Sequence, residues 1–513
     1  MTEPDSGTPE TGLYSEKELK GLATPYPDRI ISCIGDGHIS DALFLTEQMR
    51  HSQVILHDFF ADSCTALWSW TGREFGEDVI EEMFRYVFAR SAQRQFLDAA
   101  VAMAPPHLAV YLLARSWRAH CCFGAGEFPG RFRITEDSER FTFHLEPCGS
   151  GLRLMARGMY QPGRGGRITG SAHRWTYGRV KFPYYCIHCS FMNEILPYES
   201  NYGAPLWPVD PPDGPNDSCA WHVYKDPRRI PDHYYERLGV SRKPFPANRY
   251  HRPARRYFTD EDLNEMTRPM TDRISDALRK NALPRAVTLC REARNEFLVL
   301  HDLYVNMIAA TLSFIVEKAG EEALGNALAY QYEKCVQTQL WQKFLMLSGK
   351  ERISFLATVI FGIDACCGTG YDGGKFTIRE DADEITFILA PCGSGGRLIG
   401  AGSYRPMPLT RKAAESLENG LLRLSRHVRL PEAVIRMIFP FVVNRFTQRK
   451  PFDLRTVDGA HSWSFSRPAI PCYCCQCGMF ADKTAGHGIR ILPPDGRGSP
   501  CVWAIPKGLP ATE

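Results

Sequence analysis

The sequence lacks several features that would place the protein in a specialised class. Its formal net charge is only +3, so no excess of basic residues marks the whole chain as a nucleic-acid binder. The N-terminal stretch MTEPDSGTPETG is acidic and polar, without the charged and then apolar pattern of a secretory signal. The longest apolar run in the second half, AVIRMIFPFVV, is too short to cross a bilayer and contains Arg436 and Pro440. These absences predict a cytoplasmic protein that binds neither nucleic acid nor a membrane.

The sequence is long, rich in apolar residues and rich in cysteine. With 513 residues, 44% of them hydrophobic, the chain is long enough for two or three domains with cores of their own. Its 18 cysteines need an explanation other than disulfides, because a reducing compartment keeps thiols reduced. Some cysteines will serve as small buried hydrophobes. Clustered cysteines, in contrast, indicate metal binding.

A repeated phrase shows that the chain is a duplication. EPCGSGLRL contains Cys148 and APCGSGGRL contains Cys392, which lies 244 residues later. The same offset relates the two LHD triplets and carries residues 28–160 onto 272–404 without a gap. The offset then grows, because the second copy has a helical insertion at about 405–450. We therefore predict a first copy at 20–240, a basic, proline-rich linker at 241–261 and a second copy at 262–510.

Each copy changes its hydrophobic period along its length. The segments that follow FGED and AGEE space apolar residues at three and four, which predicts helices. The later segment RFRITEDSERFTFHLEPC alternates on both sides of an acidic turn, which predicts a β-hairpin, and SCAWHVYK alternates in the same way. The predicted class is α+β, with a helical layer and an antiparallel sheet in each copy. We expect the copies to pack as a pseudo-twofold pair, as homodimers do, and a further homo-oligomer stays open.

Four cysteines recur in each copy: a CxxC pair, a cysteine before the Gly-Ser-Gly turn and a cysteine on the last strand. A CxxC turn presents two thiolates to one tetrahedral zinc ion, and distant strands can supply two more ligands. We therefore predict about two Zn²⁺ ions per chain. Their ligands would be Cys148, Cys186, Cys189 and Cys219 in the first copy and Cys392, Cys474, Cys477 and Cys501 in the second. The alternative is that these are core thiols inherited from one ancestral domain.

Three side chains of the first copy are catalytic candidates. His57 or Glu146 would move a proton, and His173 lies a little upstream of the CxxC pair. In the second copy Ala390 stands where the first has Glu146, which favours the first copy as the active one. The alternative for His57 is a core histidine, since a single histidine among apolar residues is more often structural.

Three further residues are candidates for binding a substrate. Arg153 and Arg397 follow the Gly-Ser-Gly turns and could hold a carboxylate with two parallel hydrogen bonds. His301 occupies in the second copy the position of His57. For the two arginines, a structural salt bridge is the alternative.

The order of these motifs is similar to that of two related families. Cysteine at a strand end, a second cysteine-containing turn and Cys-x-aromatic on the last strand resemble 4-vinyl-reductase-type ligand-binding domains and L-2-amino-thiazoline-4-carboxylate hydrolases, as does GEEAL at 320–324. The resemblance implies a small-molecule pocket beside a cysteine-rich sheet. PCGSG and the CxxC depart from both family patterns, so the resemblance implies no particular substrate.

Two functions follow from the number of zinc ligands. Zinc held by Cys148, Cys186 and Cys189 would keep an open position for a water molecule. Zinc lowers the pKa of that water to about 7, and the protein would then be a hydrolase or lyase acting on a small molecule. With Cys219 as fourth ligand the site is closed and structural, and the protein would bind or sense a small molecule. All-thiolate zinc is a weak Lewis acid, which favours the closed site. The unequal protonatable groups of the two copies favour the enzyme, which we take as the leading hypothesis.

Overall fold

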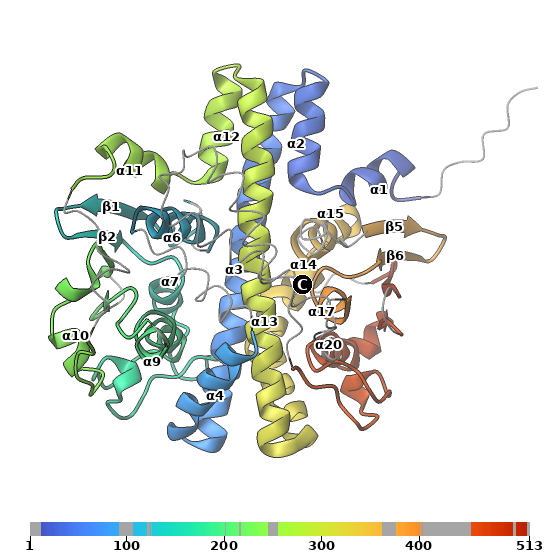
Figure 1. The fold of residues 1–513 in the computed structure, drawn as a ribbon. Helices are drawn as coiled ribbons and strands as arrows, with labels where there is room; N and C mark the ends of the chain where they lie inside the picture. The colour runs from blue at the N-terminus through green and yellow to red at the C-terminus, as the bar shows by residue number, and fades with distance from the viewer. Residues whose placement is uncertain are drawn as a thin grey trace, which may run out of the picture.

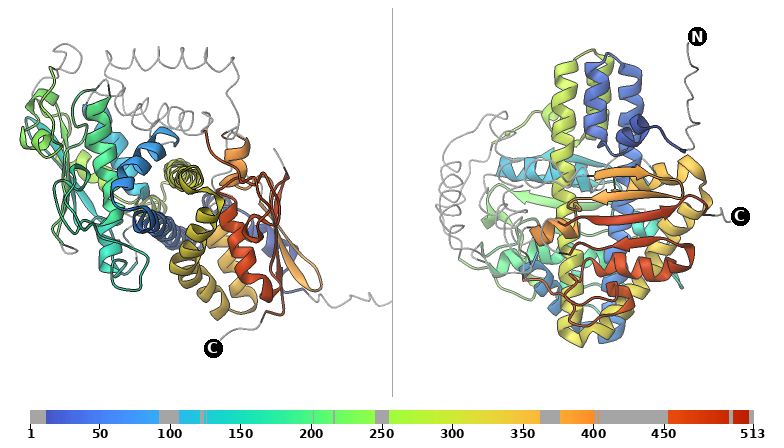
Figure 2. Two further views of the ribbon diagram at one scale, coloured as in Figure 1. Left: turned by 90° about the horizontal axis from the view of Figure 1, so that it is seen from below. Right: turned by 90° about the vertical axis from the view of Figure 1, so that its right-hand side faces the viewer.

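Two long helices form the centre of the molecule. The computed structural model describes residues 12–91, 106–120, 124, 126–200, 202–214, 217–244, 255–361, 376–400, 403, 453–495 and 499–509. Helices α3 (Ile39–Phe75) and α13 (Leu283–Gln331) lie side by side, and a four-stranded sheet lies on each outer flank (Figures 1 and 2). Helices combined with antiparallel sheets confirm the predicted α+β class. The predicted insertion at about 405–450 and residues 245–254 of the predicted linker lie outside the described residues.

The elements of the first part of the chain run from α1 to α10. Besides α3, the helices are α1 (Glu16–Leu22), α2 (Tyr26–Gly35), α4 (Asp78–Ala89), α6 (Pro106–His120), α7 (Gly151–Ala156), α8 (Ile187–Ser190), α9 (Leu196–Glu199) and α10 (His233–Glu236). The short helical turns are η1 (Arg174–Thr176), η2 (Tyr184–Cys186), η3 (Phe191–Ile195) and η4 (Pro227–Arg229). The strands are β1 (Phe132–Glu136), β2 (Arg140–Leu145), β3 (Val209–Asp210) and β4 (Cys219–Tyr224).

The second part of the chain has a similar order of long helices and strands. Besides α13, the helices are α11 (Asp260–Thr267), α12 (Met270–Arg279), α14 (Gln342–Met346), α15 (Gly349–Phe355), α17 (Gly395–Gly400) and α20 (Cys475–Thr484). The turns are η5 (Tyr332–Trp341), η6 (Leu356–Phe361), η7 (Ser462–Ser464) and η8 (Ala485–His487), of which η5 and η6 are π-helical. The strands are β5 (Phe376–Glu380), β6 (Glu384–Leu389), β7 (Arg490–Leu492) and β8 (Cys501–Pro506).

The two sheets have the same strand order and the same register. The orders are β1-β2-β4-β3 and β5-β6-β8-β7, and all pairs are antiparallel. Phe132 pairs with Leu145 in the first sheet, and Phe376 pairs with Leu389 in the second. Both predicted hairpins are confirmed. Alternation explains them, since inward side chains such as Phe143 are buried while every second residue of β1 is exposed.

The central helices are apolar on most sides because other elements surround them. Helix α3 ends at Gly76, with φ 87°, and α13 is kinked at Gly320, with φ 81°, a conformation that glycine adopts without strain. The stretch Leu283–Met346 is long and apolar enough to cross a membrane by length and composition alone. In the structure 88% of its apolar window is buried within the protein, and burial of a core helix accounts for such a composition.

The N-terminal helix of each half lies on the sheet of the other half. The backbone N–H groups of Leu13 and Tyr14, just before α1, donate to the Glu380 carboxylate of β5, at 2.5 and 2.9 Å. In the same way the N–H groups of Tyr257 and Phe258, just before α11, donate to the Glu136 carboxylate of β1. Figure 1 shows α11 beside β1 and α1 close to β5. The repeat therefore extends N-terminally to residue 13, well beyond the start at 28 that sequence identity reveals.

Candidate functional site

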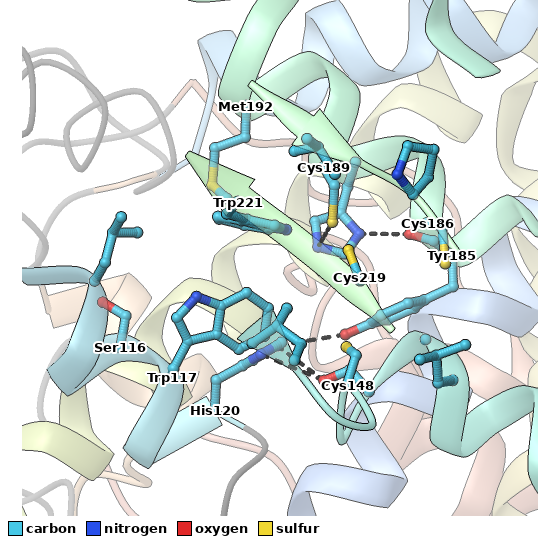
Figure 3. A pocket seen from close by; sticks show the side chains of 18 of the residues that line it. Ser116, Trp117, His120, Cys148, Tyr185, Cys186, Cys189, Met192, Cys219 and Trp221 are labelled. Carbon is cyan, nitrogen blue, oxygen red and sulfur yellow. Dashed lines mark hydrogen bonds between the residues drawn. The ribbon is translucent and has the colours of Figure 1, made fainter. Parts of the chain in front are cut away.

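A cavity of about 110 Å³ lies in the first half between the sheet, α6, the CxxC turn and α13. All four cysteines predicted as ligands in the first copy line this first cavity, with Trp117 and Trp221 beside them (Figure 3). A second cavity of about 170 Å³ lies in the other half, and all four predicted cysteines of the second copy line it. The sequence thus identified eight cysteines that gather four by four around two cavities.

The Gly-Ser-Gly turn is small because the CxxC pair packs directly upon it. A Cβ atom added to Gly151 would lie 2.5 Å from Cys186 Sγ. At the equivalent Gly395, an added Cβ would lie 2.6 Å from Cys474 Sγ. Both distances are far below a carbon–sulfur contact, so only glycine fits. This contact explains why the chain has the same phrase twice.

The cysteines of the first cavity have the donor chemistry for zinc. Burial, and secondarily the neighbouring Cys148, raises the pKa of the Cys186 thiol, and the same causes raise that of Cys219. These thiols are therefore protonated at neutral pH, and a metal would have to displace protons. Within the part of the chain that the structure describes, no three His, Cys, Asp or Glu side chains are grouped so as to hold a metal ion. The zinc sites stay a prediction.

His57 lies beside the turn and contacts a serine that the sequence analysis did not select. Its Nε2 is 2.8 Å from Ser150 Oγ, and its Nδ1 is 3.3 Å from Asp58 Oδ1. Burial lowers the pKa of His57, so the ring is neutral and its Nε2 can accept the serine proton. Burial alone would raise the pKa of Asp58, but hydrogen bonds from His57 and Arg153 outweigh burial and hold that pKa well below its usual range. Serine, histidine and aspartate thus stand in the order of a catalytic triad.

The Arg153 side chain makes its hydrogen bonds to groups within the protein. Its guanidinium makes two parallel 2.8 Å hydrogen bonds to Asp58 and a third to the Phe128 carbonyl. In the second half Arg397 binds Asp302 in the same way, at 2.9 and 3.0 Å. Both arginines, predicted as substrate anchors, therefore form the structural salt bridge that was their alternative.

The same triad recurs in the second half. His301 Nε2 lies 3.1 Å from Ser394 Oγ, and its Nδ1 lies 3.2 Å from Asp302 Oδ1. His301 and Ser394 both line the second cavity. The serine hydroxyl and the imidazole are therefore common to both cavities. Any chemical difference between the two cavities must come from the other residues that line them.

In the first cavity a chain of hydrogen bonds continues from Ser150. Its Oγ is 3.3 Å from His120 Nδ1, His120 Nε2 is 2.7 Å from Tyr304 Oη, and Tyr304 Oη is 2.6 Å from Tyr185 Oη. Burial lowers the pKa of His120 well below its ordinary value, and the nearby His57 adds to this. Burial, with Tyr304 beside it, keeps the pKa of Tyr185 well above the ordinary value, so this tyrosine remains a donor. Tyr304 comes from α13, so the second half completes the first cavity.

The second cavity lacks some polar groups of the first, although Tyr473 lines it where the first has Tyr185. Phe60 of α3 lines it where the first cavity has Tyr304, Phe465 stands where the first has Tyr177, and Gln476 where it has His188. Among the residues that the structure describes, the buried Tyr177 hydroxyl has no hydrogen-bond partner, so it is available to a bound molecule. Asp364, the counterpart of His120, lies outside the described residues.

Two predicted catalytic residues lie outside the first cavity. Glu146 is 43% exposed and pairs with Arg133 at 3.1 Å on the hairpin. His173 stacks on Trp175 and donates a 3.2 Å hydrogen bond from Nε2 to the Glu77 carboxylate at the start of α4. His461 and Glu321 form the same pair in the second half. The structure does not bring Glu146 and His173 together with the cysteines, and their catalytic role has no support from their positions.

Sequence reasoning selected His57 but missed its partners Ser150, His120, Tyr185 and Tyr304. A signal was present for the serine: LHD and PCGSG are the two phrases that recur almost unchanged at one offset. Tyr185 also recurs, as Tyr473 just before the second CxxC pair, whereas Tyr304 has Phe60 at the equivalent position and gave no such signal.

Comparison with protein-family models, with curated proteins and with solved structures finds no match to this chain. The resemblance to the two families named above therefore remains untested, and the fold and the cavities carry the functional argument alone.

Proposed function

We propose that the first cavity is the active site of a hydrolase that cleaves a small, largely apolar ester, thioester or amide. The observation that carries the proposal is the 2.8 Å contact of His57 Nε2 with Ser150 Oγ, beside a cavity that Ser150 lines. A neutral histidine activates a serine by accepting its proton, and an ionised aspartate stabilises the imidazolium that results. The cavity volume of about 110 Å³ suits a short acyl group.

The reaction follows from these roles. Ser150 Oγ attacks the substrate carbonyl carbon as its proton passes to His57 Nε2. The carbon–leaving-group bond then breaks, and His57 returns that proton to the departing oxygen, sulfur or nitrogen. Water then attacks the acyl-serine as its proton passes to His57, and His57 gives that proton to Ser150 Oγ as the carboxylic acid leaves. His120, Tyr185 and Tyr304 supply donors beside the reacting hydroxyl, as electrostatic stabilisation of a developing negative charge requires.

Substitution of the serine tests the proposal, and the second half supplies a matched control. With p-nitrophenyl acetate as probe, we expect Ser150→Ala to lower kcat/KM by at least about 10³-fold, because the nucleophile is lost. Ser394→Ala should leave the rate within about twofold of wild type. A fluorophosphonate should label the peptide that contains Ser150. If wild-type protein is neither labelled nor active on a panel of short acyl esters, thioesters and amides, the proposal is wrong.

A second candidate is zinc binding at the two cysteine sets. It is favoured by one observation, that four cysteines from distant segments gather around each cavity. If those thiols close on a metal, protein purified without chelators should contain about two zinc ions per chain. Cys186→Ser should then lose one ion, and loss of stability would mark that ion as structural. Absence of metal from the purified wild type would remove this candidate.

We further propose that the two halves are related by a pseudo-twofold axis between α3 and α13. The reciprocal contacts support it: α13 lines the first cavity with Leu300, Leu303 and Tyr304, and α3 lines the second with Leu56, Phe59 and Phe60. These two sets of residues are equivalent at the offset of 244.

A further inference from the structure

The second cavity is large enough for a ring compound and is predominantly apolar. Its volume of about 170 Å³ exceeds the roughly 150 Å³ of an engineered apolar cavity that binds benzene. Aromatic side chains supply much of its wall, among them Trp341, Phe344, Phe480 and Trp503. A site of this composition selects a flat, apolar molecule by contact and by exclusion of water.

The cavity retains its serine and histidine, and Tyr473 in place of Tyr185, but it lacks two of the hydroxyls that surround them in the first cavity. Phe60 and Phe465 contribute only ring atoms where Tyr304 and Tyr177 contribute hydroxyl groups to the first cavity. A polar substrate group would therefore lose hydrogen bonds in the second cavity, at a cost that favours apolar occupants. Because it lacks these two hydroxyls, the second cavity is better suited to bind an apolar molecule than to catalyse the reaction proposed for the first cavity.

A pair of rings joins the two cavities. Phe60, in the wall of the second cavity, stacks on Tyr304, in the wall of the first, with ring centroids 5.4 Å apart and planes 9° apart. Tyr304 in turn contacts His120, whose Nε2 is 2.7 Å from the Tyr304 hydroxyl. A molecule bound in the second cavity contacts Phe60, and any movement of the Phe60 ring shifts Tyr304 or breaks the stacking contact, because packed cores do not deform freely.

We propose that the second cavity binds a benzene-sized apolar ring compound without converting it, and that its occupancy is transmitted to the first cavity through Phe60 and Tyr304. This inference concerns a second site and does not depend on the reaction assigned to the first. The ligand acts as an effector in the thermodynamic sense, since it alters the balance between two arrangements of the stacked pair.

Binding is tested by calorimetric titration of the full chain with toluene. Val336 lines the second cavity, so Val336→Phe fills it and should lower toluene affinity by at least about tenfold. Leu356→Phe fills the same cavity from η6 and is the second variant should the first not fold. Met192→Phe is the matched control, because it fills the first cavity with phenylalanine, the residue that stands at the equivalent Phe480 of the second half. In this variant the affinity for toluene should stay within about twofold of wild type. Absence of toluene binding in the wild type, or loss of binding only in Met192→Phe, would overturn the site.

Transmission is tested by fluorine NMR with 3-fluorotyrosine placed at position 304. Saturating toluene should shift or split the resonance in otherwise wild-type protein and leave it unchanged in the Val336→Phe background. A resonance that does not respond to bound toluene would overturn the transmission. Because this readout needs no substrate, an inactive Ser150 would not affect its outcome.

Discussion

The two ring nitrogens of His57 have different partners, and this fixes the chemistry of the site at the scale of single residues. Nδ1 lies against the ionised Asp58, so it carries the proton, and Nε2 is left to accept the proton of Ser150. Arg153 holds Asp58 in place through two hydrogen bonds. The arginine predicted as a substrate anchor thus positions Asp58, and through it the histidine that we propose as the base.

The pH dependence of catalysis follows from His57. Burial lowers its pKa below the ordinary value of 6.5, and the reaction needs the neutral ring. We expect kcat/KM to stay constant as the pH falls through 6.5 and to decrease only at lower pH, where His57 becomes protonated. A pH series of initial rates on p-nitrophenyl acetate measures this. An acidic limb centred above 6.5 would contradict the assignment of His57 as the base.

Asp62 shows how the two halves have diverged at one position. It is buried and hydrogen-bonded to Arg157 at 3.1 Å, whereas the second half has Asn306 and Ala401 at these places. Burial raises the pKa of Asp62 to about 7, only partly offset by Arg157. The first half therefore has a titrating carboxyl where the second has a neutral amide.

Asp62→Asn introduces the residue that the second half has at this position and removes the titratable carboxyl group. Because the folded protein holds the Asp62 proton more tightly than the unfolded chain does, its contribution to stability is full below about pH 4 and is lost as the pH rises through about 7. The free energy of unfolding of the wild type relative to Asp62→Asn should thus fall by roughly 2 kcal/mol between pH 5 and pH 8. Urea unfolding at both pH values provides the measurement. A relative stability that rises with pH would show that the carboxyl is ionised in the folded protein.

At the scale of elements, the hairpins and the turn after them were predictable because their signals are local. Alternating apolar residues set the β1–β2 and β5–β6 pairings, and each Gly-Ser-Gly phrase marks the tight passage into α7 or α17. The segment after FGED is helical as expected in α4. What the local pattern did not reveal is that the turn is tight because a sulfur atom lies against it.

A methyl group at Gly151 tests this contact. Because the new Cβ would lie 2.5 Å from Cys186 Sγ, we expect Gly151→Ala to lower the free energy of unfolding by about 1–3 kcal/mol through overpacking. Gly35→Ala is the control, since no atom lies within 4 Å of its added Cβ at the end of α2, and the stability should be unchanged or raised by up to about 1 kcal/mol. Denaturant titration compares the two. Equal stability of Gly151→Ala and wild type would show that the turn relaxes without cost.

At the scale of the whole molecule, each half depends on the other. The segment before α11 donates two backbone hydrogen bonds to the buried Glu136, which also pairs with Lys225 at 2.9 Å. Tyr304 of α13 completes the first cavity. A half expressed alone would lack both contributions and would expose the apolar face of its long helix.

Expression of residues 1–250 alone tests this dependence and the proposed pseudo-twofold relation together. We expect the fragment to form a homodimer in which α1 of one chain takes the place of α11 on the sheet of the other, since both segments present two N–H groups to an equivalent glutamate. Light scattering with circular dichroism distinguishes the states. A folded monomer would contradict the dependence, whereas an insoluble fragment would support it without establishing the pairing.

The sequence by itself determined the α+β class, the hairpins and the eight cysteines that line the cavities, and it showed motifs repeated at one offset, because periodicity and repetition are properties of neighbouring residues and of a constant spacing. Only the tertiary structure decided that Ser150 meets His57, that Glu146 and His173 lie elsewhere, and that Tyr304 crosses from one half into the cavity of the other. Those contacts join segments about a hundred residues or more apart, and their geometry depends on how α3 and α13 pack against each other. No spacing along the chain encodes that packing.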